Sequence, residues 1–320
     1  MSFFKIPQNY APGFAPQRYL FINDAAASTL TARLTDARTS TLVAELALRD
    51  LWMPEIEVSA FLQRMAAAVP FEAEATGLYA PTTRTMTLAV AIGSDTAADR
   101  IFLPATRTTQ AGEPLTSLPA TRLIGPNETD ELSVQCRTHC SAILTATCNG
   151  VPSEHAYEVT AGGVALFRLA AAEFPDAESF DLTLTADGVK SVFHYEVAET
   201  PVGSRRLAWL NAAGGIDRYT FPLTEERRYE IERQRLLLEE AGHTRTETIG
   251  EQRLLLGSAY EPAAVLDALA QLAAAPAVWA ATDEGWTEID VISDSLRIER
   301  PGKLQHLSLE IRSRQRGGRL

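Results

Sequence analysis

The chain has 320 residues, of which 46% are hydrophobic and 22% charged, and its formal net charge is −12. This length is large for one hydrophobic core and fits two or three domains. Residues 1–200 hold 13 Lys and Arg against 23 Asp and Glu, whereas residues 201–320 hold 16 against 18. The acidity therefore belongs to the N-terminal two thirds, which disfavours nucleic acid as a partner because binding phosphates needs a basic face.

The N-terminal segment, the hydropathy pattern and the cysteines bear on location. Residues 1–9 lack a basic segment followed by a long apolar run, and Pro7, Pro12 and Pro16 interrupt this region, so we expect no signal peptide. No stretch approaches 18 uninterrupted apolar residues, which predicts no membrane span. Three cysteines are an odd number in a long chain and suit a reducing compartment better than a disulfide scaffold.

Residues 1–105 predict an N-terminal arm followed by a β-rich domain. Residues 1–17 contain Pro, Gly and aromatic residues without a period, which indicates an extended arm. Later segments alternate apolar and polar residues, the pattern of half-buried strands. Alanine is the best helix former, so the alanine-rich stretches 42–48 and 60–68 leave a helix open, although we favour strands for most of them. The expected strands are 19–22, 29–34, 41–48, 55–62 and 85–92.

A second domain is expected over residues 106–200. The Pro-, Thr- and Gly-rich stretch 104–127 breaks regular structure and indicates a domain boundary. At least five β-prone runs follow, and Asp187-Gly188 between two of them is the strongest short hairpin signal in the chain. Strands that recur about every ten residues are typical of an immunoglobulin- or fibronectin-like β-sandwich. The expected strands are 131–136, 142–148, 164–169, 180–185 and 191–197.

Residues 201–320 predict a small α+β domain, in which a β-sheet carries one short helix. Pro262 suits a first helical turn, and apolar residues between Val265 and Leu272 recur on one helical face. Pro276 ends this helix. Further strands are expected at 278–282, 287–292 and 306–312, with Asp283-Glu-Gly285 as a hairpin turn.

Residues 225–259 fit either a helix or a long hairpin. Residues 225–240 are strong helix formers, but Tyr229 and Ile231 also alternate with glutamates, as on a strand. Residues 241–243 contain a glycine and break the run, and a second half of similar composition follows. Two matching halves around such a break favour the hairpin, and the helix remains the alternative.

The most distinctive stretch is the hairpin expected at residues 206–221. Two short strands carry apolar and aromatic side chains, and residues 211–215 supply the bend. Gly214 and Gly215 can both take the positive φ values that a tight reversal often needs, so we expect this hairpin to organise the third domain. Taken alone, the pattern favours a purely structural hairpin.

The cysteines do not form a strong metal motif. Cys136, His139, Cys140 and Cys148 have the spacing C-x3-C-x7-C, which lacks the paired C-x2-C elements of typical zinc sites. Cysteines on such strands are more often small core residues. We therefore expect no metal and no cofactor.

Candidate catalytic acids are equally weak. Asp290 and Asp294 near Glu288 resemble a pair of hydrolase acids only in residue type, because such pairs are recognised by their separation in space. Charged outer faces of strands explain them better. No nucleophile elbow, metalloprotease or phosphate-binding motif occurs in the sequence, and we expect no catalytic residue.

The hairpin block does resemble a known class of proteins. Its pattern W-L-N-x-x-G-G-x-D-x-x-T-F is similar to a hairpin in structural proteins of phage and prophage tail modules. Downstream, A-P-A-V-W, G-W-T-E-I-D-V and L-x-x-L-x-L-E-I-R resemble the closing part of distal-tail or baseplate-like proteins. The resemblance covers about residues 201–315. It implies an assembly role for Trp209, Asn211, Gly214, Gly215, Asp217, Tyr219, Phe221, Trp279 and Trp286.

The resemblance implies a non-enzymatic virion structural protein of a phage-type tail or a related contractile or injection particle. Such a protein is expected to form homo-oligomers, to bind other tail or baseplate proteins, and to assemble in the bacterial cytoplasm without a small-molecule substrate. Sheet edges and large protomer interfaces suit this role. The alternative is a carbohydrate- or surface-binding β-sandwich protein with Trp286 as an exposed aromatic residue. A hydrolase using acids in 283–294 is a third hypothesis.

Overall fold

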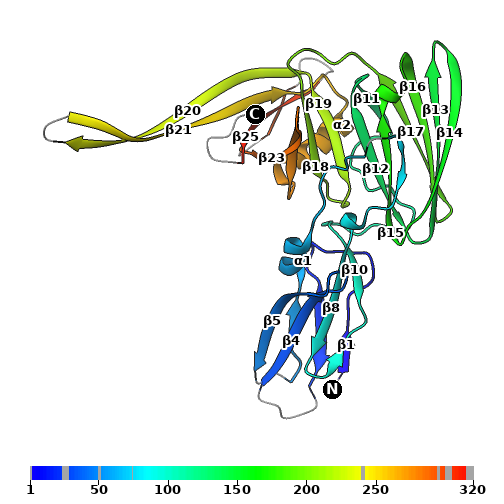
Figure 1. The fold of residues 1–320 in the computed structure, drawn as a ribbon. Coiled ribbons are helices and arrows are strands. Elements are labelled where there is room, and N and C mark those ends of the chain that lie inside the picture. The colour runs from blue at the N-terminus through cyan, green and yellow to red at the C-terminus, as the bar shows by residue number, and fades with distance from the viewer. Residues whose placement is uncertain are drawn as a thin grey trace. The chain divides into compact units, whose positions relative to one another are not determined.

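The computed structural model describes residues 2–23, 29–49, 52–73, 75–238, 242–293, 296–299 and 305–314. Strands make up most of its regular structure, which confirms the expected mainly β fold (Figure 1). The chain forms two compact units. The first comprises Met1–Val197 and Asn211–Ile216, and the second comprises Ala198–Leu210 and Asp217–Leu320. No helix in the described part of the chain is long and apolar enough to cross a membrane.

In the first unit, residues before Pro104 form two sheets that share one hydrophobic core. One sheet has the order β1-β3-β6, and the other has the order β2-β10-β8-β4-β5 with β9 paired to β8. Strand β8 buries every second residue from Met86 to Ile92, as strand periodicity predicts. The elements are β1 Ser2–Lys5, β2 Ala11–Pro12, β3 Arg18–Ile22, β4 Thr29–Asp36, β5 Thr41–Arg49, β6 Glu55–Glu57, α1 Ser59–Met65, β8 Met86–Ile92, β9 Asp95–Thr96 and β10 Arg100–Leu103, with the 3-10 turn η1 at Thr82–Arg84.

The strand expected at residues 55–62 is wrong in its second half. It ends after Glu57, and α1 follows, with Leu62 buried in the core. The Glu57 carboxylate accepts a hydrogen bond from the Ser59 backbone N–H, and the amide of Leu62 donates to the Val58 carbonyl. The alternation of Ile56 and Val58 is too short to exclude a helix after it. Strand β6 and helix α1 bury their apolar residues in the same core, so the apolar residues alone do not distinguish a strand from a helix here.

The alanine-rich segment 42–48 is a strand, as favoured. It belongs to β5, which pairs with β4 over its whole length. Leu46 and Leu48 pack against the same core as the other strands. Pairing and packing therefore outweigh the intrinsic helix propensity of Ala44 and Ala47.

The other two sheets of the first unit form a sandwich. A five-stranded sheet has the order β11-β17-β16-β13-β14, and a three-stranded sheet has the order β12-β15-β7. Leu144 and Leu182 of the first sheet share a core with Leu132 and Phe167 of the second. The elements are β7 Gly77–Tyr79, β11 Thr121–Ile124, β12 Thr129–Cys136, β13 His139–Cys148, β14 Val151–Thr160, β15 Gly163–Ala170, η2 Ala171–Glu173, β16 Ala177–Ala186 and β17 Val189–Val197.

Local turn chemistry behaves as expected at Asp187-Gly188. Both residues have positive φ and join β16 to β17. The Asp187 carboxylate also accepts hydrogen bonds from the backbone N–H groups of Arg137 and Thr138 and from the Thr138 hydroxyl. Partial burial opposes ionisation, but these hydrogen bonds hold the pKa of Asp187 below its usual value. One residue thus joins two turns of the sandwich.

Contacts cross the boundary expected near residue 105. Strand β7 of the first stretch pairs with β15 of the second. The guanidinium of Arg84 lies 2.5 Å from the carboxylate of Glu131, and both side chains are buried. Residues 1–105 and 106–197 accordingly lie in one compact unit, while the second unit begins at Ala198, close to the expected boundary at 201.

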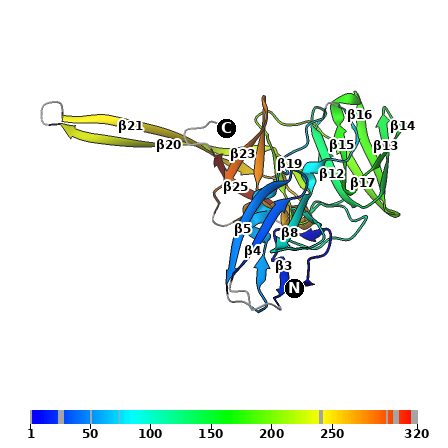
Figure 2. The ribbon, with the colours of Figure 1, turned by 60° about the horizontal axis from the view of Figure 1, so that its bottom comes forward.

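The second unit is built on one sheet with the order β19-β18-β22-β23-β25-β21-β20, and β24 pairs with β25 (Figure 2). The helix expected after Pro262 is present as α2, and its buried Leu266 and Leu269 lie on one face. The elements are β18 Arg205–Leu210, β19 Ile216–Phe221, β20 Leu223–Leu238, β21 Gly242–Gly257, α2 Ala263–Ala270, η3 Gln271–Ala274, β22 Val278–Thr282, β23 Gly285–Val291, β24 Arg297–Glu299 and β25 His306–Ser313.

Residues 225–259 form a hairpin, not a helix. Strands β20 and β21 are 16 residues each and pair along their length. Of β21, Arg253–Gly257 also pairs with β25. In the described part of the chain, the rest of the two strands pairs only with itself and extends away from the sheet (Figures 1 and 2). We call residues 226–238 and 242–252 the arm.

Candidate functional site

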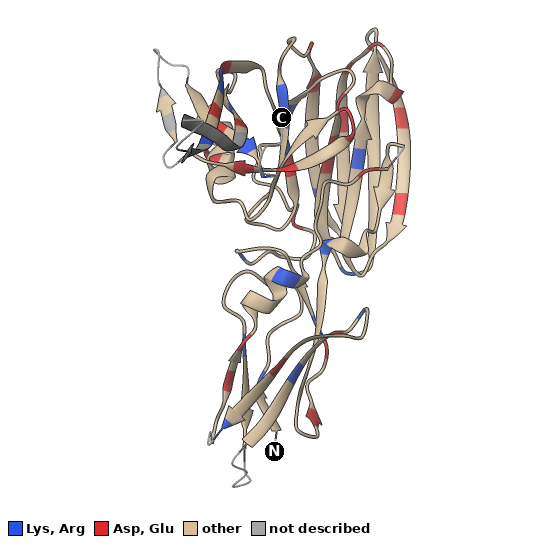
Figure 3. Cartoon of the chain, turned by 60° about the vertical axis from the view of Figure 1, so that its left-hand side comes forward, with Lys and Arg blue, Asp and Glu red and all other residues tan. Residues whose placement is uncertain are grey.

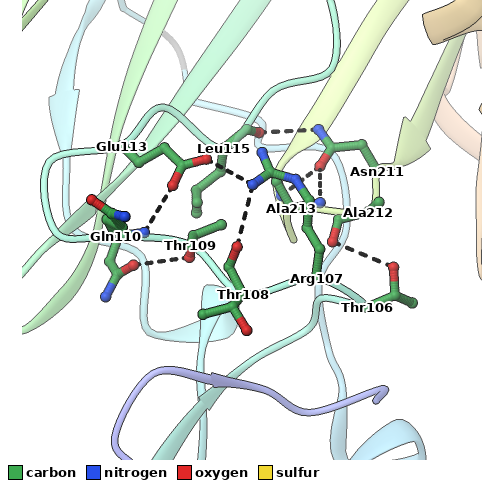
Figure 4. Close-up of polar contacts among 12 residues, drawn as sticks. Thr106, Arg107, Thr108, Thr109, Gln110, Glu113, Leu115, Asn211, Ala212 and Ala213 are labelled. Atoms are coloured by element: carbon green, nitrogen blue, oxygen red, sulfur yellow. Dashed lines mark hydrogen bonds and ion pairs between the residues drawn. The ribbon is translucent and has the colours of Figure 1, made fainter.

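The turn of the 209–221 block is a closely packed structural site. Asn211 is buried, and its Oδ1 accepts hydrogen bonds from the backbone N–H groups of Ala213 and Gly215. Its Nδ2 donates to the carbonyl of Leu115 at 3.0 Å (Figure 4). The amide of Gly214 donates to the Asn211 carbonyl. One side chain therefore shapes the turn and joins it to the segment 104–115.

The two glycines of the turn are required for different reasons, which corrects the expectation of two positive φ values. Gly214 has φ +90 and lies close to Pro104 and Ala105. Gly215 is outside the positive-φ region, but a Cβ there would lie 1.9 Å from the Leu115 carbonyl oxygen. Gly215 is thus a position of close backbone approach, where any side chain collides with main chain.

The segment facing the turn is itself ordered by hydrogen bonds. The backbone N–H groups of Thr106 and Arg107 both donate to the carbonyl of Ala212, at 3.0 and 3.1 Å. The Arg107 guanidinium donates a hydrogen bond to one carboxylate oxygen of Glu113. The other carboxylate oxygen accepts a hydrogen bond from the backbone N–H of Gln110 (Figure 4). The turn lies in the first compact unit, so its packing stabilises that unit. The expectation that the turn organises the C-terminal domain is therefore wrong.

The aromatic residues of the block are mostly core residues of the second unit. Trp209 and Phe221 are fully buried, and Trp279 is nearly so. Trp286 is half-buried, and the guanidinium of Arg218 lies 4.9 Å from its ring centroid. Arg218 thus occupies one face of the Trp286 ring.

The polar residues of the block are buried or half-buried. Asp217 is 1% exposed. The hydroxyl of Tyr219 donates to the carboxylate of Glu261 at 2.8 Å and accepts from the amide of Ala259 at 3.0 Å. Burial raises the pKa of Tyr219, and burial also raises the pKa of Glu261 above its ordinary value. This pair joins β19 to the segment before α2.

The raised pKa of Glu261 predicts a pH-dependent stability. The folded state holds the proton of the Glu261 carboxyl more tightly than the unfolded state does. The contribution of this group to the free energy of unfolding is therefore complete below its pKa in the unfolded state, and it is lost as pH rises through its pKa in the folded state. Glu261→Gln keeps an acceptor for Tyr219 but cannot ionise. We expect its unfolding free energy, relative to the wild type, to rise with pH across this window.

Urea unfolding at a series of pH values measures this difference. Glu284→Gln, at an exposed turn in the same unit, is the matched control and should show no such trend. If the difference in unfolding free energy between Glu261→Gln and the wild type did not change with pH, burial would not raise the pKa of Glu261 as proposed.

The remaining candidate residues are the cysteines and the acids of residues 288–294. Cys136 and Cys140 are buried in one core cluster, as small core residues, and burial raises the pKa of Cys140 to about 12. Among the described residues, no group of three or more His, Cys, Asp or Glu is positioned to hold a metal ion. Asp290 is ion-paired with Arg312 at 2.7 Å, and Glu288 contacts Arg314. Asp294 lies outside the described residues.

Sequence reasoning did not identify the arm as a candidate surface. Tyr229 is 60% exposed and Ile231 is 51% exposed, on strand β20. The signal was present in the sequence, where these two apolar residues interrupt a run of charges at 225–233. Alternation alone does not show which face of a strand remains uncovered.

No protein-family model matches this chain, and no curated protein matches it either. The structural site and the arm therefore carry the functional argument.

Proposed function

We propose that the protein is a non-enzymatic structural component of a phage-type tail or a related contractile or injection particle, and that it acts through oligomeric assembly. In this role it contacts copies of itself and other tail or baseplate proteins. It becomes particle-associated after assembly in the bacterial cytoplasm. The resemblance of residues 201–315 to distal-tail and baseplate-like proteins supports this class.

The arm is the observation that carries the proposal. A two-stranded ribbon is at best marginally stable alone in water, because it has no core to bury its side chains. Here the arm pairs far beyond the last strand of its sheet and exposes Tyr229 and Ile231. Contact with another protein would cover these side chains and supply partners for the open strand edges.

Removing the part of the arm beyond Arg228 and Arg253 tests the proposal. Residues 229–252 can be replaced by Asn-Gly, which joins the paired residues Arg228 and Arg253 through a two-residue turn and keeps the pairing of β21 with β25. We expect light scattering to give a multiple of the monomer mass for the wild type and the monomer mass for this variant. Circular dichroism should show that both retain β structure.

A wild-type chain that stays monomeric at all concentrations, and that does not associate with tail proteins in purified particles, would contradict the proposal. A deletion variant that assembles like the wild type would show that assembly does not use the arm.

A further inference from the structure

One face of the arm combines positive charge with exposed apolar side chains. Side chains alternate between the two faces of a strand, and β20 has no bulge from Arg227 to Arg233. Arg227, Tyr229, Ile231 and Arg233 therefore lie on one face, and all four are exposed. We call these four residues the arm strip. Neither arginine has an ion-pair partner among the residues whose side chains the structure describes, a set that excludes 234–249.

The opposite face of the arm is different, because its arginines are paired with carboxylates. Arg228 is paired with Glu226 at 3.0 Å, and Arg253 is paired with Glu230 at 2.7 Å and with Glu251 at 3.1 Å. On this face both arginines are paired, and the three glutamates that pair with them outnumber them. The arm strip is consequently the face suited to recognition.

The outer face of the five-stranded sheet in the first unit presents a complementary surface. The pairing registers place Val192, Thr183, Ile143 and Ala156 in one row across β17, β16, β13 and β14. Val192 is 54% exposed and Ile143 is 46% exposed. Strands of a sandwich normally turn polar residues outward, so the exposed Val192 and Ile143, with Thr183 between them and Ala156 beyond, make this row more apolar than its surroundings. We call it the outer row.

Carboxylates surround the outer row. Glu154 and Asp181 lie in the adjacent row on one side, and Glu158 lies in the adjacent row on the other. All three are exposed. Lys190 and His194 are the basic side chains of these two rows, and the His194 ring contacts Asp181 at 2.8 Å. Acidic residues still prevail, because the two rows hold three carboxylates against one lysine and one histidine, and Figure 3 shows acidic residues on these strands.

We propose that the arm strip of one copy binds the outer face of the five-stranded sheet of a second copy. Tyr229 and Ile231 would cover the outer row, and the two arginines would face the carboxylates beside it. The arm strip is long enough to cross the outer row: six residues of strand span about 20 Å, and the four strands of the row span about 14 Å. This inference rests on the proposed function, since it names the partner through which assembly occurs.

Charge reversal on the arm strip tests the contact. Arg227→Glu with Arg233→Glu places like charges against the carboxylates, so we expect self-association to weaken by roughly tenfold or more in sedimentation velocity. The control is Arg228→Glu, a single charge reversal on the opposite face, which should leave self-association within about twofold of the wild type. Raising the salt concentration should weaken the wild-type complex, because exposed charges are screened.

A compensating change identifies the receiving surface. Adding Glu154→Arg and Glu158→Arg to the double arm variant should restore self-association. If the arm variant lost self-association and the two added arginines did not restore it, the five-stranded sheet would not be the surface that the arm strip binds. An arm variant that assembles normally, or a control that fails equally, would overturn the arm strip. In both cases wild-type assembly would still support the proposed function, whereas a monomeric wild type would overturn both.

Discussion

Replacing Gly215 with valine should destabilise the first compact unit by about 3 kcal/mol, at the upper end for overpacked sites. The added Cβ would lie 1.9 Å from the carbonyl oxygen of Leu115, and main chain cannot rotate away as a side chain can. Changing Gly214 to valine as well should add about 1–3 kcal/mol, because a β-branched residue is strained at φ +90. Urea unfolding followed by circular dichroism measures both losses.

Two other glycines separate collision from backbone strain. Gly203 has φ +85, and a Cβ added there would have no other atom within 4 Å, so Gly203→Val should show the strain alone. Gly162 has neither a positive φ nor a near neighbour, so Gly162→Val should be close to neutral. Cys136→Ala, which removes one buried sulfur, should cost within the ordinary range of about 0.5–3 kcal/mol.

The effect of the Gly214/Gly215 double variant should appear where the turn packs. Limited proteolysis with mass-spectrometric mapping should detect new cleavage in the segment 104–115, which hydrogen-bonds to the turn through Thr106, Arg107 and Leu115. Unchanged protease resistance there would mean that the turn is an ordinary loop with room for side chains.

Replacing Arg84 with methionine should cost about 3–5 kcal/mol, the usual penalty for leaving one partner of a buried ion pair alone. The side chains of Arg84 and Glu131 are 1% and 0% exposed. Glu131 also accepts a hydrogen bond from the amide of Phe71 at 2.7 Å, so its carboxylate cannot move to solvent without breaking a second contact. Thermal and urea unfolding should both show the loss.

Two comparisons make this prediction specific. Arg33→Met breaks an exposed pair with Glu45, whose side chains are 66% and 48% exposed, and should cost less than about 1 kcal/mol. Arg84→Met combined with Glu131→Met removes both charges and should recover much of the stability lost by Arg84→Met. If Arg84→Met and Arg33→Met proved equally mild, the charges would be better hydrated than their burial indicates.

Local patterns were sufficient for much of the second unit and of the sandwich. The Asp187-Gly188 turn, the hairpin at 206–221, the helix after Pro262 and the long hairpin of β20 and β21 all depend on residues close together in the chain. Turn chemistry, strand alternation and helix entry are set within a few residues, so sequence alone reveals them. The exceptions include α1, where a short alternation resembled a longer strand, and β11 and β14 of the sandwich, which were not among the expected strands.

Residue types also identified the turn of the 209–221 block but not the reason for its glycines. Gly214 follows from turn geometry, which is local. Gly215 is needed because Leu115, far earlier in the chain, approaches its backbone. Likewise, the block's aromatic residues were recognised as important, yet whether Trp209 or Trp286 reaches solvent depends on what packs over each ring.

The sequence by itself determined the mainly β class, most strand positions and the turns between neighbouring strands, because these depend on short-range periodicity and backbone preference. Tertiary structure alone decided which distant strands pair, as β7 does with β15 and β11 with β17. It also decided that Arg84 meets Glu131 in the interior while Tyr229 and Ile231 stay exposed. Burial is the physical reason: it results from contacts between segments far apart in the chain, and no local pattern contains them.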